Sequence, residues 1–89
     1  MLPPRRRALV SGVVVDGVGR PLAGVLLGIS SGDHPYPEIG VVSGYDGTFE
    51  LPPLIPGRYV ISAYSTRGSA KVAIEARADA PNHLTMVIA

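Results

Sequence analysis

Short apolar stretches alternate with glycine- and proline-rich breaks along the whole chain. Within the stretches, residues such as Val25, Leu27 and Ile29 are separated by single intervening positions, which is the two-residue period of a strand with one buried face. The breaks recur roughly every 8 to 12 residues, a spacing typical of an all-β sandwich. No window of a dozen residues keeps a helical apolar period free of glycine or proline. The pattern therefore predicts a domain made of strands alone.

Seven strands are expected, and seven strands fit two packed sheets better than one open sheet. Glycine takes positive φ without steric cost, so Asp16-Gly17 is a predicted turn, whereas Asp46-Gly47 and Arg67-Gly68 predict hairpins. Gly12 and Gly24 are expected where a side chain would obstruct close packing. The predicted strands span residues 8–15, 24–30, 39–44, 48–51, 58–65, 70–77 and 83–88.

The bulk properties limit the classes of protein that this chain fits. Eighty-nine residues supply one core, so we expect residues 1–7 to form a disordered or extended basic tail and residues 8–89 a single domain. A net charge of +1 argues against nucleic acid as a partner. No apolar stretch approaches the roughly 20 residues of a membrane span. The apolar run 8–15 is interrupted by Gly12 and lacks a following cleavage site, so no export signal is predicted.

Three segments of the chain together resemble a known family. The first is Val-Ser-Gly-Val-Val-Val-Asp (10–16) followed by Gly-Arg-Pro-Leu-Ala-Gly-Val (19–25), the second is Ser-Gly-Tyr-Asp-Gly-Thr-Phe-Glu-Leu (43–51), and the third is Leu-Ile-Pro-Gly-Arg-Tyr (54–59). In this order they look like the carboxypeptidase regulatory-like domain family, over most of the chain from Ala8 to Ile88. One departure is Gly44, in a segment where family members commonly carry threonine before the turn; glycine there predicts a bulge or a close backbone approach.

The resemblance implies a fold, a role and a compartment. The fold would be an all-β, seven-stranded antiparallel Greek-key β-sandwich, transthyretin-like or immunoglobulin-like. The role would be that of an accessory structural or interaction domain without catalytic activity, and the compartment extracellular or periplasmic. Thr66-Arg67-Gly68-Ser69 is superficially similar to the C-terminal motif of the transthyretin-like 5-hydroxyisourate hydrolases, but it lies far from the C-terminus and begins with threonine instead of tyrosine. That activity is not expected.

The residues offer little for catalysis or for binding a cofactor. Asp33, His34 and Glu38 are a conceivable metal set, but one histidine and two acids in a loop are more often solvated. No Gly-x-Ser-x-Gly elbow occurs. Asp16 and Asp46 each precede a glycine and are interpreted as turn residues that accept backbone hydrogen bonds, with calcium ligation as the weaker alternative. We therefore expect neither an enzyme, nor a cofactor, nor a metal site.

An excess of apolar residues at outward positions is the remaining signal. If Val10, Gly12 and Val14 point inward, then Val13 and Val15 point outward, and Leu26 likewise lies opposite Val25 and Leu27. The first two strands of a sandwich commonly pair, which would place the candidate interface residues together on one exposed face: Val13, Val15 and Leu26. A contiguous apolar patch usually marks an interface, although β-propensity alone also favours valine in strands.

The sequence thus predicts a structural or protein-interaction module that assembles with itself or with an adjacent domain through an apolar sheet face. A second hypothesis is a carbohydrate-binding module, in which Tyr36, Tyr45 and Tyr64 would stack on sugar rings. Sugar sites favour a flat aromatic platform, and a chain without tryptophan offers a poor one.

Overall fold

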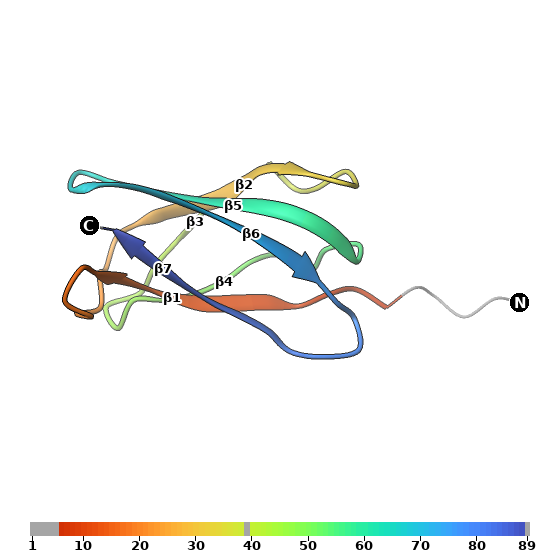
Figure 1. Cartoon of the computed structure of the whole chain (residues 1–89), viewed down its shortest axis with the longest axis horizontal. Helices are drawn as coiled ribbons and strands as arrows, with labels where there is room; N and C mark the ends of the chain where they lie inside the picture. The colour runs from red at the N-terminus through yellow and green to blue at the C-terminus, as the bar shows by residue number, and fades with distance from the viewer. Residues whose placement is uncertain (1–5, 39, 89) are drawn as a thin grey trace, which may run out of the picture.

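The computed structural model describes residues 6–38 and 40–88, and in this part of the chain all regular structure is β-strand (Figure 1). The prediction of an all-β domain is confirmed, and no described segment is a helix long and apolar enough to cross a membrane. Met1–Arg5 of the predicted basic tail lie outside the described residues, whereas Arg6 and Arg7 are exposed. The strands are β1 (Val10–Asp16), β2 (Leu26–Gly32), β3 (Val41–Val42), β4 (Thr48–Glu50), β5 (Gly57–Ser65), β6 (Gly68–Ala76) and β7 (Asn82–Ile88).

The strands form two sheets that enclose one apolar interior. One sheet has the order β4-β1-β7 and the other the order β3-β2-β5-β6, and the two layers face each other in Figure 1. This arrangement is that of a β-sandwich. The pairs are antiparallel except for β1 and β7, which run parallel from the pair Val10–Asn82 to the pair Asp16–Ile88. The expectation of purely antiparallel sheets is therefore wrong at this pair, because the β6–β7 connection crosses between the sheets and brings β7 beside β1 in the same direction.

The expected pairing of the first two strands is also wrong, because both edges of β1 are occupied by other segments. β7 lies along one edge for the whole length of β1, and β4 pairs with Ser11–Val13 on the other. Beyond β4, the N–H of Val14 donates to the carbonyl of Gly47, and the carbonyl of Val14 accepts from the N–H of Leu22. No edge is left for β2, so the chain passes to the second sheet after β1.

The turns at Asp46-Gly47 and Arg67-Gly68 differ in what they connect. Ser65 and Gly68 close a tight hairpin between β5 and β6, as predicted. Gly47 has φ +79° and forms a turn, but the strands before and after it belong to different sheets. The predicted β3–β4 hairpin is therefore wrong at the level of sheet pairing, although the local turn is present.

The interior is filled from both sheets by the alternating positions that the sequence indicates. Of six predicted core residues, five are buried and Ile29 is partly buried against them. Gly12 is required by packing, because a Cβ there would collide with the Leu84 carbonyl and the Phe49 ring. Gly24 has open space around it and φ +73°, so its requirement is conformational, not steric. The buried members of the predicted core are Val25, Leu27, Phe49, Tyr59 and Ile61.

Ser43 ties the segment after β3 to the start of β2. Its hydroxyl donates to the carbonyl of Leu22 at 2.7 Å and accepts from the N–H of Val25 at 3.0 Å. Its own N–H donates to the carbonyl of Val25 at 2.9 Å. Ser43 is almost fully buried, and its hydroxyl gives the buried Val25 N–H a hydrogen-bond partner.

Gly44 itself lies in the turn that follows, where its carbonyl accepts from the N–H of Gly47. The nearest backbone atom to a Cβ at Gly44 would be the Thr48 carbonyl at 3.9 Å, so the bulge or close approach expected at Gly44 is wrong.

Phe49→Ala should be among the most destabilising single changes. The ring is 5% exposed and packs against Gly12, and deleting a buried phenyl group leaves a cavity, at a cost of about 3–5 kcal/mol in the free energy of unfolding. Urea denaturation followed by circular dichroism measures this change. Tyr45→Ala is the matched control, since Tyr45 is 93% exposed and its truncation should change stability little. Equal losses for the two variants would contradict the assigned core.

Ser43→Ala should cost about 1–3 kcal/mol in unfolding free energy, because it removes the partner of the buried Val25 N–H and of the partly buried Leu22 carbonyl. The same denaturation experiment measures it, and Ser65→Ala is the control, since Ser65 also bonds the backbone but at an exposed site. A Ser43→Ala variant as stable as the control would show that the hydroxyl contributes nothing.

Candidate interaction surface

A row of apolar side chains crosses the outer face of the four-stranded sheet. Leu26 on β2 is directly opposite Val42 on β3 and Tyr64 on β5, so the three side chains lie on the same face. They are 49%, 61% and 49% exposed, respectively. The inward neighbours Leu27 and Ala63 are fully buried. We call Val42, Leu26 and Tyr64 the apolar row; they form a contiguous apolar surface across three adjacent strands.

A shallow depression lies beside this row. Its lining includes Leu26 and Tyr64 together with Gly28, Glu38 and Gly40. A Cβ at Gly40 would contact the side chain of Leu26, so glycine allows the loop before β3 to approach the row closely. The surface at the apolar row is therefore hollowed on one side, and a partner with a complementary shape would fill this depression.

The sequence-predicted interface residues do not lie together. Leu26 belongs to the apolar row, whereas Val13 and Val15 are partly exposed on β1 in the other sheet. Val15 is opposite Val87 on β7, which is 51% exposed. The expected cluster of Val13, Val15 and Leu26 on one face is therefore wrong, because it depended on β1–β2 pairing. Val42 and Tyr64 were not among the predicted interface residues, because their adjacency to Leu26 arises from strand order.

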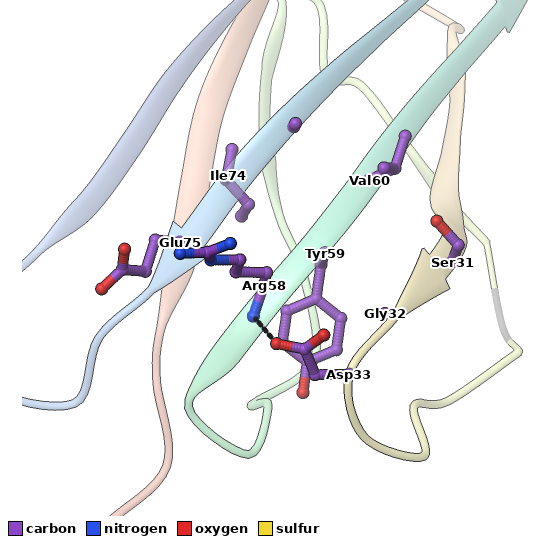
Figure 2. A pocket seen from close by; sticks show the side chains of 9 residues that line it. Ser31, Gly32, Asp33, Arg58, Tyr59, Val60, Ile74 and Glu75 are labelled. Carbon is purple, nitrogen blue, oxygen red and sulfur yellow. Dashed lines mark hydrogen bonds between the residues drawn. The ribbon is translucent and has the colours of Figure 1, made fainter.

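A second groove, lined by the charged residues Asp33, Arg58 and Glu75 among others, lies at the other end of the same sheet (Figure 2). Asp33 follows β2, and its carboxylate accepts the backbone N–H of Arg58 at 3.0 Å. Arg58 is opposite Glu75 on β6, and the ring of Tyr59 is buried nearby with its hydroxyl donating to the Ile55 carbonyl. No histidine, cysteine or lysine is among the residues that line the groove. The lining residues are Ser31, Gly32, Asp33, Arg58, Tyr59, Val60, Ala73, Ile74 and Glu75.

The two histidines lie in different parts of the fold. His34 is partly buried in the loop after β2, and its ring lies so close to Gly57 that a Cβ there would contact it at 2.8 Å. His83 is exposed on β7, opposite Ser11. Among the described residues, no group of three histidine, cysteine or acidic side chains gathers closely enough to hold a metal ion. Asp33, His34 and Glu38 thus do not form such a group.

The three tyrosines of the carbohydrate hypothesis have three different surroundings. Tyr36 packs edge-on against the buried Tyr59, with ring centroids 6.4 Å apart. Tyr45 is almost fully exposed in the turn before β4, and Tyr64 belongs to the apolar row. Tyr36 is partly buried against the core, so it does not present a free ring face beside the other two.

The turn aspartates bind their own backbone, as predicted. Asp16 Oδ1 accepts from the N–H groups of Val18 and Arg20, and Asp46 Oδ1 accepts from the N–H and the hydroxyl of Thr48. Bonds from Arg20 and Val18, with a smaller contribution from the Arg67 guanidinium, lower the pKa of Asp16 against the opposing effect of desolvation. The Thr48 hydroxyl, followed by its N–H, lowers the pKa of Asp46.

Comparison with protein-family models and with curated proteins gives no match for this chain.

The free energy of unfolding should fall in acid as Asp16 and Asp46 become protonated. A carboxyl whose pKa is lowered by folding stabilises the protein above its unfolded pKa, which is about 4, and this contribution is lost as pH falls through the folded pKa. Asp16→Asn keeps an oxygen acceptor but does not titrate. Its unfolding free energy should therefore depend less on pH below about pH 4 than that of the unmodified chain. Denaturation series at several pH values measure both slopes. Identical slopes would show that Asp16 is not coupled to folding.

Proposed function

We propose that this domain is a non-catalytic structural or protein-interaction module that contacts another copy or an adjacent domain through the apolar row. The observation that carries the proposal is the direct cross-strand adjacency of Val42, Leu26 and Tyr64, each about half exposed or more. Single exposed apolar residues are ordinary on protein surfaces, whereas contiguous ones usually mark binding sites. Tyrosine is also among the residues enriched in interface cores.

The polar groups best placed for chemistry already serve the fold, and this supports a non-catalytic role. Asp16 and Asp46 hold turns, and the Ser43 hydroxyl is both donor and acceptor to buried backbone. A catalytic nucleophile needs a base within hydrogen-bond reach, whereas the Ser43 hydroxyl donates to a carbonyl. A turnover abolished by His34→Ala would contradict this part of the proposal.

We also propose that the domain is a transthyretin-like, Greek-key sandwich similar to the carboxypeptidase regulatory-like family. Two residues of the segments that carry the resemblance serve the packing of the interior: Gly12 allows close packing of Phe49, and Tyr59 points into the interior. The two sheets of three and four strands support the proposal at the level of architecture. The family's accessory role is the function proposed here.

Cysteine labelling tests whether the apolar row is covered. The chain has no cysteine, so a single introduced thiol reports one position. Val42→Cys places it in the apolar row, and Val87→Cys is the matched control on the opposite sheet; the native valines are 61% and 51% exposed. In the dilute purified chain the two thiols should react with a maleimide at similar rates. In the cells that produce the protein, or in concentrated solution, Val42→Cys should react at least about tenfold more slowly, as expected for a site that is nine-tenths occupied.

Circular dichroism of both variants checks that each one folds. Equal labelling of the two thiols under all conditions would contradict the proposal, because a covered row cannot stay reactive. Selective protection of Val87→Cys would place the interface on the sheet that contains β1.

A further inference from the structure

The outer edge of β6 has no strand paired to it in the described part of the chain. β6 is nine residues long and pairs with β5 along its entire length, from Gly68–Ser65 to Ala76–Gly57. It is an end strand of its sheet, and neighbouring β7 belongs to the other sheet. Long edge strands are templates for pairing with another chain unless the protein blocks them.

The backbone groups of alternate β6 residues are directed toward this edge. In a two-residue hairpin the closing pair, here Ser65 and Gly68, is of the hydrogen-bonded kind, and the two kinds of pair then alternate along the ladder. By this alternation the N–H and carbonyl groups of Lys71, Ala73 and Glu75 point away from β5. Within the described residues, 6–38 and 40–88, no other group forms a hydrogen bond with these outward N–H and carbonyl groups.

The end of the edge is already closed by a side chain. Asn82 accepts the N–H of Arg77 at 2.9 Å through Oδ1 and donates to the Arg77 carbonyl at 2.8 Å through Nδ2. The side-chain amide of Asn82 therefore pairs with the backbone groups of Arg77 as a neighbouring strand would. An added strand would have to pair with the part of β6 that precedes this position.

We propose that two copies of this chain pair through their β6 edges, antiparallel, about a two-fold axis at Ala73. In this register Lys71 of each copy lies opposite Glu75 of the other, so the dimer gains two cross-strand pairs of opposite charge. Ala73 lies opposite its own counterpart, where a small side chain allows close approach. The three hydrogen-bonded pairs would form about six backbone hydrogen bonds, two for each pair. The two four-stranded sheets would become one continuous sheet.

The charges on the outer face favour this register over its neighbours. Sliding one strand by four residues in one direction opposes Lys71 to its own counterpart, and sliding it by four residues in the other direction opposes Glu75 to its counterpart. Like charges directly opposite each other are destabilising, whereas opposite charges stabilise the pair. The pairing about Ala73 is the register that opposes Lys71 to Glu75 on both sides.

The inward face of β6 supports the same arrangement. Val72 and Ile74 pack against the core but remain only partly buried, so the interior is incompletely covered along this edge. In the proposed register Val72 of one copy lies opposite Ile74 of the other, and each covers the other's exposed part. The inward face of the β6 edge, with Val72 and Ile74, is therefore self-complementary, and so is its outward face, with Lys71 and Glu75.

This inference goes beyond the proposed function, since it names a second copy as partner and adds the β6 edge to the apolar row as a separate contact. Charge variants test the register directly. Lys71→Glu and Glu75→Lys should each remain folded, because both side chains are exposed, and each should weaken dimerisation by about tenfold or more, since two attractive pairs become repulsive. The double variant, Lys71→Glu with Glu75→Lys, should restore dimerisation.

Mixing the two single variants gives the sharpest test, because a mixed pair brings opposite charges together at both positions. Sedimentation velocity at increasing concentration should show dimers of twice the 9.3 kDa chain mass for the unmodified chain, the double variant and the mixture. Each single variant alone should stay monomeric at the same concentration. Ala73→Pro should also abolish the dimer, since it removes an edge N–H that the fold itself does not use.

Two outcomes would overturn the inference. A chain that is monomeric up to roughly millimolar concentration, about −4 kcal/mol of binding free energy, would show that the edge does not pair with itself. A dimer unaffected by the charge variants and Ala73→Pro but lost on Leu26→Ser would place the contact on the apolar row. That second result would leave the proposed function standing.

Discussion

The arrangement of this domain depends on the pairing of β1 along both of its edges. β7 takes one edge in parallel, while β4, Gly47 and Leu22 share the other. Gly12 lies at the centre of this arrangement, where the Leu84 carbonyl and the Phe49 ring fill the space that a side chain would need. Because β1 has no free edge, the chain must cross to the second sheet before β2, and that crossing fixes which outward residues become neighbours.

The exposed surfaces follow from this division. Leu26 is separated from Val13 and Val15 by the interior, and it finds Val42 and Tyr64 as neighbours instead. β6 becomes an end strand whose inward side chains are only partly covered. One sheet thus presents both an apolar row on its face and a free edge along β6. The two features are suited to different contacts, since a face packs side chains whereas an edge offers backbone hydrogen bonds.

Local patterns in the sequence predict the strands and the core well, because side-chain alternation and turn chemistry depend on neighbouring residues. Val25, Leu27 and Phe49 are buried as expected, and the aspartates of the turns bind the backbone as expected. Strand order is not local, and here the prediction failed: nothing between Asp16 and Leu26 in the sequence indicates that the chain changes sheets. The role of Ser43 was missed for the same reason, since its partners Leu22 and Val25 lie some twenty positions earlier in the chain.

Nuclear Overhauser contacts between backbone protons test the central claim, the double pairing of β1, most directly. Contacts are expected between β1 and β7 in parallel register, such as Val13 with Thr85, together with contacts between Gly12 and Phe49. Slow amide exchange at Val14, which donates to Gly47 within this pairing, should accompany them. A ladder of contacts between β1 and β2, with no contacts from β1 to β7, would contradict the account.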